Sequence, residues 1–416
     1  MEDTVANVDG GKILTLKQKT WEKIPDAVLV VIGIFVFFNP FPHTTSIREA
    51  AYYLGLVLAI AYLIKNRDYS FLKTPLTLPV ALFVFWSFLS LFWAIDVETS
   101  VHDFRSHLLE YIALFCILVA FFNTPKKLRI LFWIIVISVT VSAMDEMFVF
   151  YVKGNQSLTR RLIIPNHQLP VGPLGFMSMY AAILSLFLIQ FEKRWISKSI
   201  LAFCLLTLVL TTFVVQTRAI LVAMPFAVGV LFWHRKKVLL LFVGLALILG
   251  GVTLTKFRGG IVGGTYTDRL TINYISYLVV KEHPLRGIGF GIDTFGNSKF
   301  IDHEHYRSQV PEEILHKSVQ VTSPHNMWMS VAVRTGLVGF ALFVGILLTA
   351  FKMCFRVAGE SGGPMRRSYG YCVTATFIAF AIYGLFNVVF MHFLEMLLCV
   401  SFATIAVVGN RSLDEV

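Results

Sequence analysis

Apolar runs of roughly 17–25 residues recur from one end of the 416-residue chain to the other, and this is the length that crosses a bilayer as an α-helix. Because the hydrocarbon interior holds no water to satisfy backbone polar groups, only helices or a closed barrel can span it. The runs are continuous rather than alternating, which selects helices. Only 15% of the residues are charged, against about 25% in a soluble domain. The sequence therefore predicts an all-α polytopic membrane protein.

About twelve spans are expected, and the loops between them alternate in charge. One set of loops, which includes KNRDYSFLK and WHRKKV, is short and densely basic and so belongs in the cytoplasm; the other set lies outside. Both termini are then cytoplasmic, and the polar N-terminal segment is too long to belong to a cleaved signal. The spans are expected at roughly 25–39, 49–64, 75–94, 107–122, 128–151, 171–190, 199–215, 219–233, 238–255, 327–351, 369–389 and 391–408.

This topology divides the chain into five units. They are a cytoplasmic segment at 1–24, spans one to nine within 25–255, an external loop with short helices at 256–326, spans ten to twelve within 327–408, and a cytoplasmic tail at 409–416. Within the external loop, TYTDRLTINYISYLVVKEHP predicts a helix that Pro284 ends. The following LRGIGFG predicts a tight glycine turn that lets the backbone lie close to a neighbour, in preference to a phosphate-binding loop.

The net charge of +11 would suggest a nucleic-acid partner in a soluble protein. Here the basic cytoplasmic loops explain part of the excess, so we expect no nucleic acid. The five cysteines lie in or beside apolar runs, which predicts neither a disulfide framework nor a zinc site. Basic residues on the outside are what the topology rule disfavours, and they need another reason. These external residues are Arg160, Arg161, Arg218, Arg258, Arg269 and Arg286.

Four of these arginines are candidates for binding an anion. Spans seven and eight are joined by little more than Gln216-Thr217-Arg218, so Arg218 is held at the outer face. Its guanidinium either points into the bundle or snorkels to lipid phosphates. Arg160 and Arg161 precede a proline-rich segment, which could hold one of them over a pocket; Arg161 is favoured because Leu162 follows it. Arg269 opens the loop helix, where the helix dipole disfavours a cation.

His325 is the candidate general base. It lies between Pro324 and Asn326, at the outer mouth of span ten. An imidazole with a pKa near 6.5 suits a proton acceptor near neutral pH, and neighbouring cations should lower that pKa further. Ser323 or Asn326 could cap the helix or hydrogen-bond the ring. The alternative is a structural histidine.

The acidic residues of the outer face offer two possible metal sites, one at Asp96, Glu98 and Asp103 and one at Asp302–His305. We expect both groups to be solvated, because nothing nearby fixes their ligands. The prediction is therefore that no metal binds and that arginine replaces it. Asp145 and Glu146, late in span five, are expected to be buried partners of arginine or hydrated near the outer end.

These motifs carry a family resemblance. SPHNMWMSVAVRTGLVG resembles the His-Asn…Gly-x-x-Gly signature of the O-antigen ligase and polymerase superfamily, QTRAILVAM resembles its short arginine turn, and HPLRGIGFG resembles its late glycine-rich segment. The resemblance implies a bacterial inner-membrane enzyme with a fold akin to C-type glycosyltransferases and an active site facing the periplasm. It would transfer a glycan from undecaprenyl pyrophosphate to a sugar hydroxyl of lipid A–core without a cofactor. His325 would be the base and the arginines would bind pyrophosphate.

Arg334 departs from the family pattern, in which an acidic residue is more usual. A cation this far into a span must face the bundle interior or a wet cavity, because facing lipid would cost roughly 2.5–3.5 kcal/mol. Three alternatives remain open: an O-antigen polymerase, a protein O-oligosaccharyltransferase, and, from another class, a twelve-helix transporter. A transporter is expected to have a long central cytoplasmic loop, whereas the long loop here is external.

Overall fold

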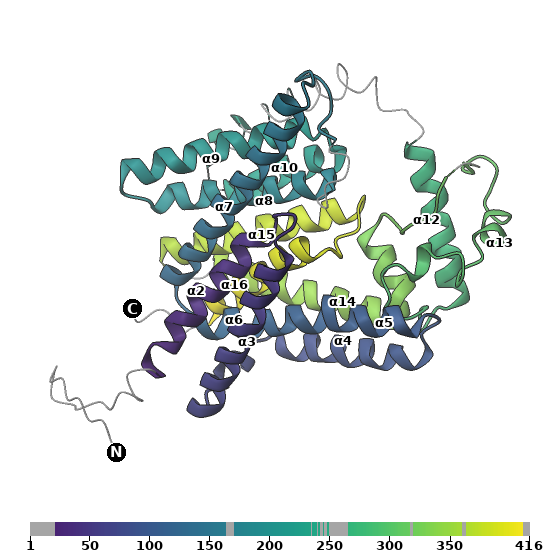
Figure 1. Ribbon diagram of the computed structural model, residues 1–416, viewed down its shortest axis with the longest axis horizontal. Helices are drawn as coiled ribbons and strands as arrows, with labels where there is room; N and C mark the ends of the chain where they lie inside the picture. Colours follow the sequence, from purple (N-terminus) through teal and green to yellow (C-terminus); the bar gives the residue numbers. More distant parts are fainter. Residues whose placement is uncertain are drawn as a thin grey trace.

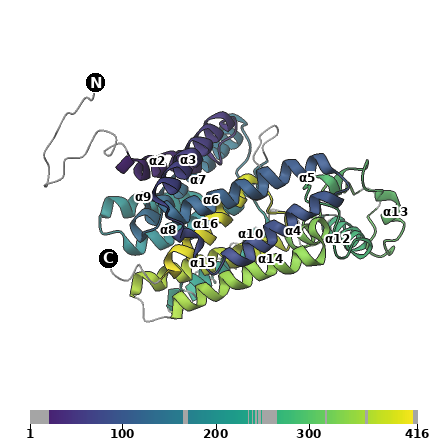
Figure 2. The ribbon, with the colours of Figure 1, turned by 90° about the horizontal axis from the view of Figure 1, so that it is seen from below.

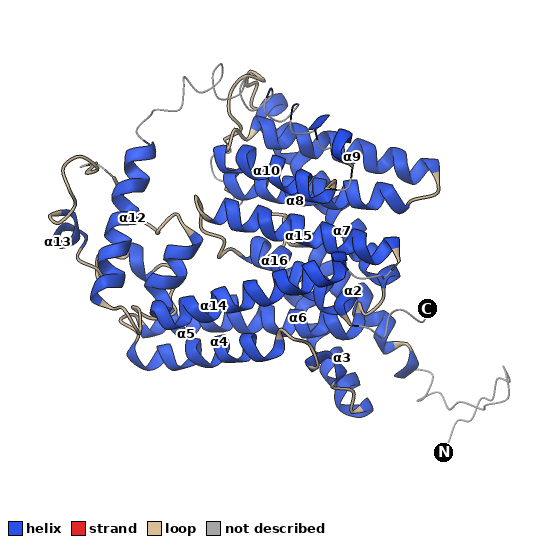
Figure 3. Ribbon diagram, turned by 180° about the vertical axis from the view of Figure 1, so that it is seen from behind, coloured by secondary structure: helices blue, strands red, loops and turns tan. Residues whose placement is uncertain are grey.

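The computed structural model of the chain describes residues 21–163, 170–233, 235–238, 240–241, 244, 248, 265–316, 319–359 and 363–410. All regular structure in these residues is helical (Figure 3). The first half contains the helices α2 (Ile24–Phe38), α3 (Thr45–Asn66), η1 (Ser70–Leu72), α4 (Thr77–Leu89), η2 (Ser90–Trp93), α5 (Val97–Asp103), η3 (Phe104–Leu109), α6 (Glu110–Phe121), α7 (Pro125–Met147), η4 (Phe148–Lys153) and α8 (Val171–Phe191).

The second half contains α9 (Trp195–Val214), α10 (Arg218–Leu231), α12 (Thr265–Glu282), η6 (Thr294–Gly296), α13 (His303–Arg307), α14 (Met327–Gly359), α15 (Pro364–Gly384) and α16 (His392–Gly409). By length and apolar composition, seven described helices could cross a membrane: Thr45–Asn66, Val97–Phe121, Pro125–Lys153, Val171–Phe191, Trp195–Val214, Met327–Gly359 and His392–Gly409. The chain is accordingly a multi-pass membrane protein. Each expected span except the ninth overlaps a described helix. The ninth, at 238–255, lies largely outside the described residues, so the total of twelve stays a prediction.

The helices form a bundle with two sides and one extramembrane end. In Figure 1, α8, α9 and α10 lie on one side, α4, α5 and α14 on the other, and α15 and α16 between them. α15 packs against α10, α14 and α8, and α14 packs against α4. The two helices of the expected external loop, α12 and α13, lie together beyond one end of this bundle (Figures 1 and 2).

Two helical regions differ from the sequence prediction. Residues 97–106 were expected in an external loop, but α5, the π-helix η3 and α6 continue one another from Val97 to Phe121. The Asp96 carboxylate caps this helix by accepting from the Thr99 backbone N–H at 3.1 Å. The expected tenth span is interrupted: Gly336 takes φ 68° and ψ −178° inside α14. Apolar periodicity continues across this break, so the sequence pattern does not reveal it.

The external loop has its own small core, as the predicted helix required. α12 covers the expected helix and ends at Glu282, two residues before Pro284. Apolar side chains of α12 pack against the rest of the loop and against α14, which joins the loop to the bundle. The core residues are Ile272, Ile275, Leu278, Val279, Ile288, Phe295, Ile301, Tyr306, Val310, Val319, Val321 and Val333.

Candidate functional site

His325 lies two residues before the first residue of α14, Met327, and its neighbour Asn326 caps that helix. The Asn326 side-chain Oδ1 accepts from the backbone N–H groups of Trp328 at 2.9 Å and Met329 at 3.2 Å. These bonds satisfy N–H groups that have no partner within the helix. Of the two capping candidates in the sequence, Ser323 and Asn326, it is Asn326 that makes them. His325 itself has φ +48°, the left-handed region that few residues other than glycine adopt. Its half-buried ring is therefore held by a constrained backbone rather than by the regular helix.

Arg269 lies near enough to His325 to act on its protonation. Burial, and then the positive charge of Arg269, lower the pKa of the His325 imidazole below its ordinary value near 6.5. The sequence predicted the effect of nearby cations; burial is the larger cause. Arg269 is on the first turns of α12 and is half-buried. A neutral imidazole beside a guanidinium is a proton acceptor next to an anion-binding group.

Arg161 is hydrogen-bonded to the connection between α9 and α10, the same connection that leads into Arg218. The Arg161 Nε donates to the Val215 carbonyl at 3.0 Å, and the Leu162 N–H donates to the Val214 carbonyl at 3.0 Å. Arg218 is the first residue of α10, three residues after Val215. The loop that carries Arg161 is thus bonded directly to the turn that carries Arg218.

Gln216 and Arg160 have supporting positions in the same region. Gln216 takes φ +50°, and its side-chain Nε2 reaches the Thr159 carbonyl at 3.4 Å. Arg160 is exposed, and its guanidinium donates to the Gln156 side chain. Of the two adjacent arginines, the structure therefore brings Arg161 against the α9–α10 turn and leaves Arg160 at the solvent side of the loop.

The first turn of α8 connects the two halves of the candidate site. A Cβ on Gly172 would lie 3.2 Å from the Tyr383 hydroxyl, and a Cβ on Gly175 would lie 2.5 Å from Ile220 Cδ1. Tyr383, near the end of α15, also interacts electrostatically with Arg269. The start of α8 therefore lies between the α9–α10 turn and the end of α15. Tyr383, at that end of α15, is a residue on which the Arg269 charge acts. Glycine at both positions permits this close packing.

The acidic groups considered as metal ligands have structural roles. The expectation that Asp96 and Asp103 are solvated is wrong, since their exposed fractions are 6% and 5%. Asp96 caps α5, and the Asp103 Oδ2 accepts from the Ile292 N–H at 2.7 Å. Both were read as loop residues because the helix from Val97 was not recognised.

The second acidic group, at Asp302–His305, lies at the surface, and the two acidic residues of α7 differ in burial. Asp302 and Glu304 are exposed; Asp302 caps α13 by accepting from the His305 N–H at 3.0 Å, and Glu304 pairs with Arg307 at 2.8 Å. In α7, Asp145 is exposed whereas Glu146 is buried.

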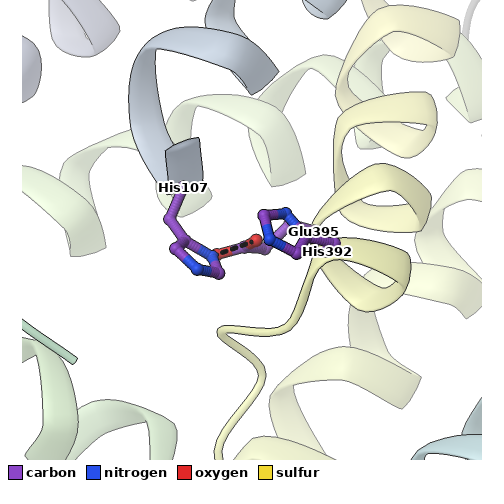
Figure 4. A group of neighbouring side chains, drawn as sticks. All are labelled: His107, His392 and Glu395. Carbon is purple, nitrogen blue, oxygen red and sulfur yellow. Dashed lines mark hydrogen bonds and ion pairs between the residues drawn. The ribbon is translucent and has the colours of Figure 1, made fainter. Parts of the chain in front are cut away.

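A polar group that the sequence analysis missed lies inside the bundle. The His107 Nδ1 is 2.7 Å from the Glu395 Oε2, and the His107 and His392 rings are stacked with centroids 4.3 Å apart (Figure 4). Ligand atoms of the three residues lie within 4.8 Å of one another, which is compatible with a metal ion. The spacing of three between His392 and Glu395, on one face of an apolar helix, was the available signal.

Two features favour a hydrogen-bonded cluster over a metal site at this position. The His107 and His392 rings are only 16° from parallel, so their in-plane nitrogen lone pairs run side by side instead of converging on one point. The Arg334 guanidinium, a permanent cation, also lines the adjoining cavity of about 130 Å³ and interacts with Glu395. Arg334 faces the bundle interior, as its cost in lipid required, with 3% of its surface exposed.

Residues 173–344 match the family described as O-Antigen ligase. No curated protein matches the chain. The matched stretch begins in the first turn of α8 and ends in α14, so it includes Arg218, Arg269, His325, Asn326 and Gln216 but not Arg161. The resemblance seen in the sequence motifs is confirmed over this stretch. The match makes this stretch of the chain similar to O-antigen ligases.

Proposed function

Because the chain carries an O-antigen ligase domain over residues 173–344, we propose that it transfers O-antigen polysaccharide from undecaprenyl pyrophosphate to a sugar hydroxyl of lipid A–core. The transfer takes place at the periplasmic face of the bacterial inner membrane. It requires no metal and no nucleotide. The observation that carries the proposal is the position of His325, a half-buried imidazole in a left-handed backbone conformation just before α14, within the field of the Arg269 guanidinium.

The chemistry needs one base and several cations. The acceptor hydroxyl oxygen forms a bond to the anomeric carbon of the donor glycan, and the bond from that carbon to the pyrophosphate oxygen breaks. The hydroxyl proton passes to His325, whose lowered pKa keeps it neutral and able to accept near pH 7. The leaving undecaprenyl pyrophosphate carries its negative charge away without needing a proton.

Arginine suits the leaving group because its planar guanidinium binds two phosphate oxygens at once. Arg161, Arg218 and Arg269 are the proposed pyrophosphate-binding residues. What supports the group is that Arg161 is bonded to the α9–α10 turn, and that the start of α8 packs against Ile220 of α10 and Tyr383 of α15. Arg160, which is exposed and bonded to Gln156, is left out of this group. Asn326 and Gln216 support the site by fixing the start of α14 and the α9–α10 turn.

The test uses the purified protein with an undecaprenyl pyrophosphate-linked glycan and lipid A–core, in excess chelator and without nucleotide. We expect the two lipids to be joined, which mass spectrometry of the product detects. If activity requires added magnesium or manganese, the metal-independent mechanism is wrong. If the glycan is joined only to a second donor glycan or to a protein, the chain is a polymerase or a protein O-oligosaccharyltransferase. Glycan movement without any bond formation would indicate a transporter.

A further inference from the structure

The break in α14 is filled by a segment from the external loop. Residues 284–292, called here the inserted segment, run along the break. The carbonyls of Val333 and Arg334 accept from the N–H groups of Ile288 at 2.9 Å and Gly289 at 3.1 Å, and the Leu337 N–H donates to the Pro284 carbonyl at 2.7 Å. In an unbroken helix, Leu337 would donate to Val333. The inserted segment therefore replaces the helix's own hydrogen bonds.

Both sides of this contact require glycine. Gly287 has φ +66°, and a Cβ on it would lie 2.5 Å from the Arg334 carbonyl oxygen. Gly336 has φ +68°, and a Cβ on it would lie 2.2 Å from the Leu285 carbonyl oxygen. The obstructing atoms are backbone, so neither side can move away without breaking the hydrogen bonds between them. A side chain at either position is excluded both by space and by conformation.

Arg334 fixes the end of the inserted segment from inside the bundle. Its Nε donates to the Phe290 carbonyl at 2.8 Å, and its Nη2 donates to the same oxygen. The guanidinium carbon lies 4.2 Å from the Phe290 ring centroid and 4.7 Å from that of Phe390. A buried guanidinium with a carbonyl acceptor and two aromatic faces is well satisfied, which explains a cation inside an apolar span.

The other edge of the inserted segment is bonded to the region around α5. The Ile95 N–H donates to the Ile288 carbonyl at 2.9 Å, the Gly291 N–H donates to the Ser100 Oγ at 3.0 Å, and the Ile292 N–H donates to Asp103. Because it is hydrogen-bonded along both edges, the inserted segment is a fixed point to which α12 is attached. It follows α12 directly, and Ile288 and Val333 belong to the core that α12 shares with the loop.

We propose that the inserted segment, fixed in the break of α14 by Arg334 and Gly336, holds α12 so that the Arg269 guanidinium stays beside the His325 imidazole. Arg334 and Gly336 are then positioning residues for the transfer, and this rests on the function proposed above. Arg269 is at the far end of α12 from the inserted segment, so a shift at the attachment point moves its guanidinium relative to α14. His325 lies just before α14, so it does not move with α12.

The electrostatic pairing of Arg269 with His325 gives a readout that general instability does not produce. Among the described residues, Arg269 on α12 is the charged group whose field acts on His325. If Arg269 moves away, the imidazolium is less disfavoured and the pKa of His325 rises. The acid limb of the ligation rate, where the base becomes protonated, then moves to higher pH.

The experiment compares Arg334→Gln and Gly336→Ala with two matched controls. Gly345→Ala changes another glycine of α14, where a Cβ meets nothing within 4 Å, and Arg286→Gln changes an exposed arginine of the inserted segment. Two quantities are measured: the pH profile of ligation, and the titration of His325 by NMR in the absence of substrates. We expect both variants to move both quantities to higher pH and to lose ligation on the order of 100-fold. The controls should keep wild-type values.

Ser100→Ala removes the acceptor for the Gly291 N–H without adding volume, and it serves if the first two variants do not fold. Ser100→Ala should also raise the pKa of His325, but by less than Arg334→Gln or Gly336→Ala. Wild-type titration of His325 in folded Arg334→Gln, or in Ser100→Ala, would overturn the positioning role while leaving the proposed ligation intact. If neither the wild type nor any variant ligates, but the His325 titration still shifts in the variants, the positioning role stands and the proposed function fails.

Discussion

At the scale of single residues, we expect His325 and Arg269 to act as one unit, because the Arg269 charge acts on the His325 imidazole. Because burial and the Arg269 charge both lower the pKa of His325, the base should remain neutral, and the rate should stay high, to a lower pH than an ordinary imidazole allows. Arg269→Gln removes one of the two causes. We expect the acid limb of its ligation profile to move to higher pH. An unchanged limb in Arg269→Gln would mean that the two residues are not paired in the working enzyme.

Arg161 and Arg218 should hold the pyrophosphate through the planar fork of the guanidinium, which lysine lacks. Hydrogen bonds to a charged group contribute about 1.5–3 kcal/mol. Arg218→Lys should therefore weaken donor binding by roughly 10- to 100-fold, nearly as much as Arg218→Ala, and Arg161→Lys should behave alike. Direct binding of the donor lipid to each purified variant measures this, with Arg286→Lys as the control. Wild-type affinity in Arg218→Lys would indicate an arginine that only reaches for lipid phosphates.

Among the elements, α14 shows how far sequence reasoning extends. Its start was predictable, because Asn326 is a capping residue placed directly before an apolar run. The helix of the external loop was predictable from its spacing and from Pro284, and the glycine turn from its three closely spaced glycines. The break at Gly336 was not, because the residues that compensate it come from about 50 positions earlier in the chain. The same holds for His107, whose partner Glu395 is 288 residues away.

The cap of α14 gives a prediction about stability. Asn326→Ala removes the acceptor for two backbone N–H groups and should cost about 0.5–2 kcal/mol, seen as a lower Tm in detergent. Asn326→Ser keeps a capping oxygen and should recover most of the loss. Ser323→Ala, which changes a side chain before the helix, is the matched control. Equal Tm values for Asn326→Ala and wild type would show that the cap is not needed to hold the helix start.

For the whole molecule, the loop charges and the position of α12 and α13 beyond one end of the bundle support a single orientation. A cysteine at Ser298, exposed in the external loop, should react with an impermeant thiol reagent in intact spheroplasts, in a background without the five native cysteines. A cysteine at Ser368, near the start of α15, should react only after the membrane is opened. The reverse pattern would invert the topology and remove every proposed site from the periplasm.

The long, continuous apolar runs made the polytopic helical fold predictable from the sequence, because the cost of burying bare backbone in lipid leaves few alternatives. The site was only partly predictable. Arg161, Arg218, Arg269 and His325 stood out as polar residues on the outer side, but the packing of α8 against α10 and α15, which brings their elements together, depends on contacts between distant helices. The buried Asp103 was misread, because its partner, the Ile292 N–H, belongs to a distant segment of the chain.

The central claim is that His325 takes the proton from the acceptor hydroxyl while the arginines hold the donor. The most direct measurement determines donor-lipid binding and ligation separately in His325→Ala and His325→Gln. A positioned general base contributes about 10²–10⁴-fold, so we predict that both variants lose ligation by that factor and bind the donor with wild-type affinity. Ligation within a few-fold of wild type in both variants would contradict the claim, and so would a loss of donor binding that accounts for the lost rate.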